Sequence, residues 1–77
     1  METFNVVQFF TDGSHEYTRR NVPVEEAMKA FQHYASSVAV RMGIVDRVII
    51  TDSGDCVNAE WKKGEGITFP KKEDTVQ

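Results

Sequence analysis

Hydrophobic residues recur every three or four positions between Pro23 and Gly43, the spacing of one buried stripe on an α-helix. The stripe consists of Val24, Ala27, Met28, Phe31, Tyr34, Ala35, Val38 and Met42. Pro23 suits the first turn of a helix, and Asn21 is the best candidate for the N-cap. Gly43 can adopt the left-handed conformation that commonly ends a helix. We therefore expect a single helix over residues 23–43.

Two segments before this helix, residues 4–10 and 15–22, are rich in amino acids that favour β-strands. Asp12-Gly13 between them is a strong hairpin signal. The first strand is apolar on both faces, which is typical of a strand inside a sheet. Its faces carry Phe4, Val6 and Phe10 on one side and Val7 and Phe9 on the other. The second strand is mostly polar, and we expect it at a sheet edge.

Residues 44–52 and 56–63 predict a second hairpin after the helix, with Ser53-Gly54 as its turn. A two-residue turn would set the pairs Ile50 with Val57, Val48 with Ala59, Asp46 with Trp61 and Arg47 with Glu60. The last pair joins opposite charges across the strands, which favours this register. Alternation then points Val57, Ala59 and Trp61 at the helix and Ile49, Thr51, Cys56 and Asn58 away from it.

Residues 1–69 are therefore expected to form one α+β domain in the order ββαββ. Placing the two apolar strands in the centre gives a four-stranded antiparallel sheet of order 2-1-3-4 with one helix packed on one face. Ile67 and Phe69 either add a short fifth strand or fold against the core. Residues 70–77 are mostly charged, and we expect a disordered tail there.

The totals restrict the class of protein. The chain has 77 residues, a single cysteine and a formal net charge of −3. One cysteine cannot form an internal disulfide, which fits a reducing compartment. With no signal-peptide pattern and no apolar run of membrane length, we expect a soluble, cytoplasmic protein. The acidic balance gives no overall attraction to nucleic acid or to an anionic membrane.

The residues that could carry chemistry each have a simpler structural explanation. Cys56, His15 and His33 are the thiol and imidazole groups, but His33 falls on the polar face of the helix. The carboxylates of Asp46, Asp52, Asp55 and Glu60 gather near the second hairpin. Asp52 and Asp55 bracket its turn, where aspartate is common. Gly64 and Gly66 do not open a helix, so they form no phosphate loop. We expect no catalytic, metal or cofactor site.

One helix covers only one face of such a sheet, and this geometry gives the main functional hypothesis. We expect the helix-free face to leave about 400 Å² of apolar surface, enough to mark an interaction site. The expected interface residues are Phe4, Val6, Gln8, Phe10 and Ile49. The other face of the first strand, with Val7 and Phe9, is the alternative; we favour the first set because an interface tolerates the amide of Gln8 better than a core does. The chain would then be a non-catalytic module that forms a homodimer or binds a protein partner, with the size of a phage or mobile-element regulator or inhibitor.

Two alternatives come from other classes of protein. The basic pairs Arg19-Arg20, Lys62-Lys63 and Lys71-Lys72, with aromatic residues on a sheet face, suit a single-stranded nucleic-acid binder. Acidic residues lie between these pairs, so this alternative ranks second. A small enzyme without a recognisable site ranks last.

Overall fold

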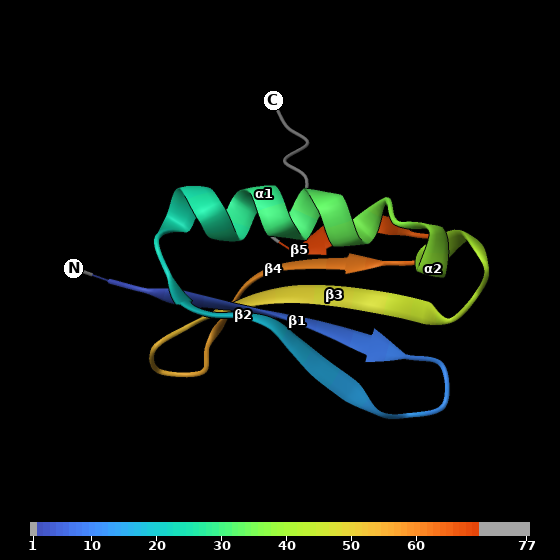
Figure 1. The fold of residues 1–77 in the computed structure, drawn as a ribbon, viewed down its shortest axis with the longest axis horizontal. Helices are drawn as coiled ribbons and strands as arrows, with labels where there is room; N and C mark the ends of the chain where they lie inside the picture. The colour runs from blue at the N-terminus through green and yellow to red at the C-terminus, as the bar shows by residue number, and fades with distance from the viewer. Residues whose placement is uncertain (1, 70–77) are drawn as a thin grey trace.

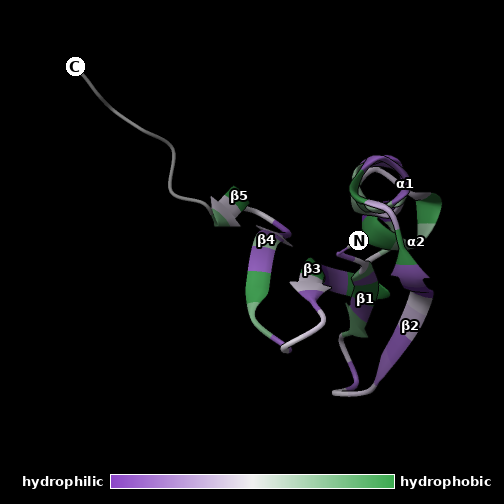
Figure 2. Cartoon of the chain, turned by 90° about the vertical axis from the view of Figure 1, so that its left-hand side faces the viewer, coloured by the Kyte–Doolittle hydropathy of each residue, from purple (hydrophilic) through white to green (hydrophobic). Residues whose placement is uncertain are grey.

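The computed structural model describes residues 2–69, and the tail expected at 70–77 lies outside this range. The elements, in order, are β1 (Phe4–Phe10), β2 (His15–Val22), α1 (Val24–Ala35), α2 (Val38–Arg41), β3 (Val45–Asp52), β4 (Val57–Lys62) and β5 (Gly66–Phe69). Figure 1 shows α1 running along one face of the sheet. In Figure 2, α1 lies on the side of β1 and β2, with β4 and β5 displaced to the other side.

The sheet confirms the expected α+β class and antiparallel pairing, but it has five strands in the order β2-β1-β3-β4-β5. The prediction of four strands is therefore wrong. Gly64 and Gly66 explain the difference, since both have positive φ angles, 88° and 77°, that glycine adopts without strain. They allow the chain to reverse after β4, so that residues 66–69 pair with it and form the second edge of the sheet.

The expected continuous helix is interrupted after Ala35. The hydroxyl of Ser36 donates to the carbonyl of Gln32 (2.8 Å), and the hydroxyl of Ser37 accepts from the backbone N–H of Val40 (3.3 Å). These serines satisfy backbone groups at a helix end and a helix start, so α1 stops there and the one-turn α2 begins.

The two ends of the helical region follow different rules. Gly43 has a φ of 80° and follows α2, as expected for a left-handed helix end. Asn21 is not the N-cap, which is Pro23 without a side-chain hydrogen bond. Asn21 instead has a φ of 54°, and its backbone N–H donates to Oδ1 of Asn5 (3.0 Å). The side chain of Asn5 thus supports the irregular end of β2.

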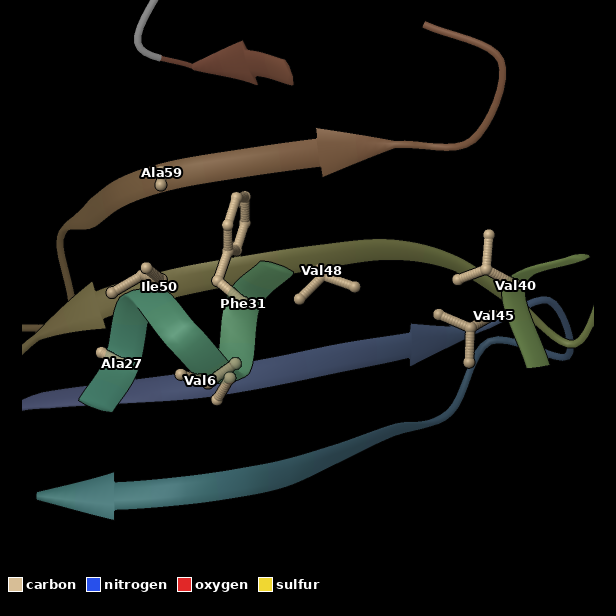
Figure 3. Packing of buried hydrophobic residues seen from close by; sticks show 9 residues of the cluster. Val6, Ala27, Phe31, Val40, Val45, Val48, Ile50 and Ala59 are labelled. Carbon is tan, nitrogen blue, oxygen red and sulfur yellow. The ribbon is translucent and has the colours of Figure 1, made fainter. Parts of the chain in front are cut away.

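The hydrophobic core lies between the helices and the sheet (Figure 3). Its buried residues are Val6, Ala27, Ala30, Phe31, Val40, Val45, Val48, Ile50 and Ala59. Phe4, Phe10 and Trp61 are partly buried against it. Several residues of the predicted stripe lie at its margin, since Met28 is 45% exposed and Met42 is 69% exposed.

The core shows that the predicted orientation of β1 is wrong. Phe4, Val6, Gln8 and Phe10 face the helix side, because Val6 pairs with Ile50 and Gln8 pairs with Val48. Gln8 is only 8% exposed, and its Nε2 donates to Oε1 of Glu16 (2.9 Å), which offsets the cost of burying an amide. Of the predicted interface, only Ile49 lies on the helix-free face.

The β3–β4 hairpin has a four-residue connection rather than the expected two-residue turn. Oδ1 of Asp52 accepts from the backbone N–H groups of Gly54 (2.9 Å) and Cys56 (3.0 Å), which closes the longer loop. Ile50 therefore pairs with Ala59, two residues further along than predicted. A shift of two keeps the same face, so Ala59 still points into the core as expected. The register is irregular between Ile50 and Thr51, and Val57, expected to face the helix, pairs instead with Thr51 and is 38% exposed.

The first prediction concerns the phase of α1. Phe31→Ala should destabilise the protein by about 3–5 kcal/mol, since Phe31 is only 3% exposed and its loss leaves a cavity. Gln32→Ala, on the exposed side of the same helix, should change stability by less than about 0.5 kcal/mol. Urea unfolding of both variants measures the difference, and equal costs would contradict this core.

Candidate functional site

The helix-free side of the sheet, which we name the open face, carries rows of side chains that run across the strands. Paired residues on neighbouring strands project to the same side, so the pairing defines each row. The first row contains His15, Phe9, Arg47 and Lys62. The second contains Tyr17, Val7, Ile49 and Glu60, and the third includes Asn5 and Thr51.

Three rings and two guanidinium groups form a continuous line on the open face. The ring centroids of Phe9 and His15 are 5.7 Å apart, and those of His15 and Tyr17 are 6.0 Å apart. The guanidinium of Arg47 lies 4.6 Å from the centroid of Phe9, and that of Arg20 lies 4.1 Å from the centroid of Tyr17. Both distances are within the range of cation–π contacts. We name these five residues the aromatic row.

The apolar residues of the open face are covered although no second layer of structure lies on them. Val7 is 3% exposed and Ile49 is 6% exposed. They lie in the second row together with Tyr17, next to the first row, which holds His15, Phe9 and Arg47. Rings and the aliphatic stems of long charged side chains can cover apolar surface while their polar ends stay in water. The bare apolar patch expected from the sequence is therefore replaced by a surface of rings and charges.

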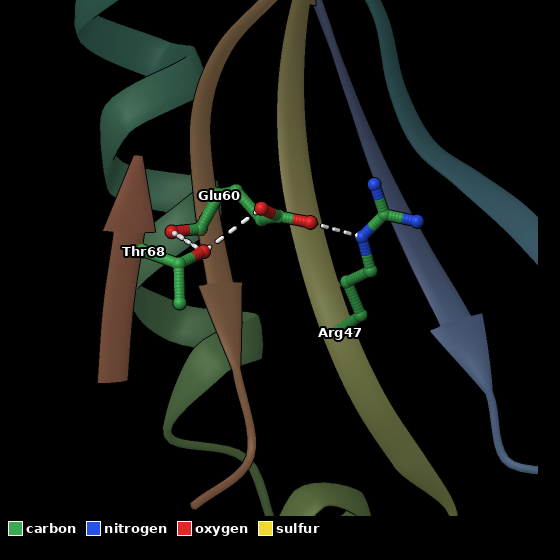
Figure 4. A network of polar contacts seen from close by, with 3 residues as sticks. All are labelled: Arg47, Glu60 and Thr68. Carbon is green, nitrogen blue, oxygen red and sulfur yellow. Dashed lines mark hydrogen bonds and ion pairs between the residues drawn. The ribbon is translucent and has the colours of Figure 1, made fainter. Parts of the chain in front are cut away.

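Arg47 is held in place by a second contact on the other side of β3. Its Nε donates to Oε2 of Glu60, and the hydroxyl of Thr68 donates to Oε1 of the same carboxylate (2.8 Å). Figure 4 shows the three side chains in front of the strands, with the helix behind. The predicted pairing of Arg47 with Glu60 thus exists as a contact, although Glu60 is paired with Ile49 in the strand register. Arg47 reaches it diagonally.

The ionisation of Glu60 reflects two opposing effects. Its burial acts to raise the pKa, but the hydrogen bonds from Thr68 and Arg47 and the positive charge of Arg47 outweigh it, so the pKa of Glu60 is lowered. Glu60 is therefore ionised at neutral pH and remains the anionic partner that orients Arg47.

A charged pocket of about 250 Å³ adjoins one end of the aromatic row. It is lined by Asp46, Arg47, Lys62, Lys63 and Glu65. Nζ of Lys63 donates to the carbonyl of Val40 at 3.2 Å, which ties this end of the sheet to α2. Three cations and two carboxylates thus meet at the end of the row where Arg47 lies. We name this region the basic end.

The structure does not bring the thiol and imidazole groups together. His15 pairs with Phe9 beside Arg47, near the start of β3, whereas Cys56 follows Asp52 at its end. Five strand residues separate these positions by roughly 17 Å. Cys56 is exposed and free. His33 stacks edge-on with its neighbour Tyr34 on α1, with the ring centroids 4.9 Å apart.

The acidic residues of the β3–β4 loop serve the loop itself. Hydrogen bonds from the backbone of Cys56 and the side chain of Asn58 lower the pKa of Asp52. These contacts support the interpretation of Asp52 as a turn residue. Within residues 2–69, no group of three His, Cys, Asp or Glu side chains is placed to hold a metal ion.

The aromatic row was missed because its members are scattered among strands. Phe9, His15 and Tyr17 lie on both sides of the Asp12-Gly13 turn, and they come together because the strand register pairs Phe9 with His15 and Val7 with Tyr17. The same-side spacing of His15 and Tyr17, and the proximity of both to Phe9 across a short hairpin, were the available signals.

Comparisons with known protein families, with curated proteins and with solved structures find no match. In the described part of the chain, each helix is too short to cross a membrane. The open face and the basic end are therefore interpreted from their own geometry.

The second prediction concerns the acid sensitivity that Glu60 confers. The pKa of Glu60 is lowered in the folded state, so its ionised form stabilises the protein at neutral pH. This contribution is lost as the pH falls below about 4.3, the usual value in an unfolded chain, and through the lower folded value. Glu60→Gln should therefore lose stability less steeply than wild type in this window. Urea midpoints from pH 7 to pH 2 measure it.

Glu25→Gln, which removes a carboxylate from the exposed side of α1, is the matched control. The Glu60 variant should be the less stable of the two at pH 7, and the difference should shrink in acid. A difference that is constant across the pH range would contradict the role assigned to the Glu60 carboxylate.

Proposed function

We propose that the chain is a non-catalytic binding module whose ligand lies on the open face. The aromatic row is the observation that carries this proposal. Tyr17 is 38% exposed, His15 is exposed and Phe9 is half-buried. Because guanidiniums lie over Tyr17 and Phe9, a ligand on this face meets rings and guanidiniums together. Tyrosine and arginine are enriched among the residues that dominate binding energies, because they combine a large flat surface with hydrogen-bonding groups.

The side chains that shield Val7 and Ile49 from water determine which ligand the open face favours. A second copy of the chain would gain little by burying Val7 and Ile49, since both are already shielded from water. The groups that remain for contact are rings, guanidiniums and a lysine of the first row. These groups favour a ligand that offers flat rings and negative charge.

A protein partner or a second copy is the second candidate, and a different surface supports it. β5 is an edge strand, and its Ile67 and Phe69 are 52% and 46% exposed. An exposed edge with apolar side chains can pair with another strand. Sedimentation velocity over a concentration series tests this candidate. A dimer that is abolished by Ile67→Lys would support this candidate. A protein that remains monomeric at all concentrations would exclude the homodimer.

The third prediction tests the open face without assuming the natural ligand. Small planar aromatic acids, such as nicotinate and indole-3-acetate, should bind weakly where rings and guanidiniums lie together. In 15N-labelled protein, titration to millimolar concentration should shift the amide signals of Phe9, His15, Tyr17 and Arg47 most strongly. Tyr17→Leu should reduce these shifts, because it removes one ring from an exposed edge position while keeping an apolar side chain.

Phe69→Leu is the matched control, since it removes an exposed ring from the other edge of the sheet. It should leave the shifts on the aromatic row unchanged. Shifts that centre on α1 and β5, or that are the same for both variants, would contradict the open face as the binding surface.

A further inference from the structure

We infer that the ligand of the open face is a single-stranded nucleic acid, with its bases stacked on the aromatic row and a phosphate at the basic end. This inference rests on the proposed function and names the class of its ligand. It rests on three features of the structure. These are the line of rings and guanidiniums, the positive local charge on an acidic chain, and a site for a phosphate beside the rings.

The first feature is the line of rings. Phe9, His15 and Tyr17 have centroid spacings of 5.7 and 6.0 Å, and neighbouring ring planes are tilted by 37° and 69°, so they form one line in which each ring has its own orientation. Every base has a flat π face, and stacking on protein rings does not depend on its identity. Guanidiniums lie over Phe9 and Tyr17, and bases stack on arginine planes as they do on aromatic rings. In a duplex the bases are already stacked on each other, so the line favours a single strand.

The second feature is the distribution of charge. The chain carries −3 overall, but the open face and the adjoining basic end place four cations, Arg20, Arg47, Lys62 and Lys63, against three carboxylates, Glu60, Asp46 and Glu65. Acidic side chains are numerous elsewhere. Glu25 and Glu26 occupy the first turn of α1, Asp12 caps the β1–β2 hairpin, and Glu16 binds Gln8 on the helix side. The open face is thus locally positive, and a polyanion would approach it from this side.

The third feature is the basic end. Arg47 belongs both to the aromatic row and to the pocket of about 250 Å³, so a phosphate in the pocket would lie next to a base on Phe9. Lys62 and Lys63 supply two more cations. Asp46 and Glu65 in the same pocket balance two of these three cations, and Glu60 is paired with Arg47. A phosphate in the pocket would be met by Lys62, whose ammonium makes no ion pair within residues 2–69.

The test measures fluorescence anisotropy with the single strands dT12 and rU12 and with a 12-base-pair duplex. Both single strands should bind more tightly than the duplex, and a preference for rU12 over dT12 would indicate contact with the 2′-hydroxyl. Two or three phosphate contacts predict a slope of about −1.4 to −2 for log K against log salt.

Two pairs of variants distinguish a specific contribution of the aromatic row to binding from a general effect of mutation or lost charge. Tyr17→Ala should weaken dT12 binding roughly 5- to 150-fold, the loss of one stacked base, whereas Tyr17→Phe keeps the ring and should bind as wild type. Arg20→Gln and Lys29→Gln remove the same charge, the first from the open face and the second from the exposed side of α1. Only the first should weaken binding. Circular dichroism verifies that each variant is folded.

Three results would overturn the inference: no binding of dT12 or rU12 at millimolar protein, equal binding of duplex and single strand, or equal effects of the Arg20 and Lys29 variants. The titration with planar aromatic acids distinguishes this failure from a failure of the proposed function. If the acids still shift the aromatic row while the oligonucleotides do not bind, the open face is a binding surface for another class of ligand. If neither binds, both proposals are wrong.

Discussion

Arg47 is the side chain on which the open face depends. It lies on β3, the middle strand of five, and so can reach neighbours on both sides. Its guanidinium packs on Phe9 of β1, and its Nε is bound by Glu60 of β4, which is itself bound by Thr68 of β5. One side chain thus links four strands on the face that the helix does not cover.

The shape of the fold creates this requirement. A five-stranded sheet with one 12-residue helix has one face with a core and one face with no second layer. Strand β1 is central and apolar on both sides, so its outer residues need shelter from water. If apolar side chains covered them, the face would carry an exposed hydrophobic patch that favours association. Rings held under guanidiniums shield Val7 and Ile49 while remaining hydrated, and the same groups can stack on a flat, anionic ligand. The cover and the proposed binding surface are therefore the same set of side chains.

The fold was largely predictable from local patterns, because these patterns act over short distances. The Asp12-Gly13 turn, the polar strand β2 and the apolar strands β1 and β3 predict the sheet order of the first four strands. Two competing local effects were underestimated. Ser36 and Ser37 satisfy backbone groups and interrupt the helix, and a four-residue stretch as short as β5 carries too little pattern to distinguish a strand from a loop.

The candidate site was not predictable to the same degree, for a physical reason. When a strand is apolar on both faces, its own sequence does not determine which face meets the helix; pairing with β3 does. The amide of Gln8 suggested the outer face, but Glu16 on β2 satisfies it in the interior. Long-range partners of this kind decide orientation and leave little trace in the spacing of residues along the chain. The helix-free face of β1 is therefore the Val7 and Phe9 side and not the Phe4, Val6 and Phe10 side, while Ile49 lies on the open face as expected.

The most direct test of this account is the environment of the Arg47 side chain in solution. If its guanidinium lies on Phe9, the methylene protons of Arg47 should be shifted upfield by the ring and should show nuclear Overhauser contacts to the Phe9 ring protons. These signals are measured in the ligand-free protein, so they test the packing of Arg47 on Phe9 independently of any ligand. Methylene shifts typical of an unfolded chain, together with the absence of those contacts, would show that the row is not formed and would contradict the account.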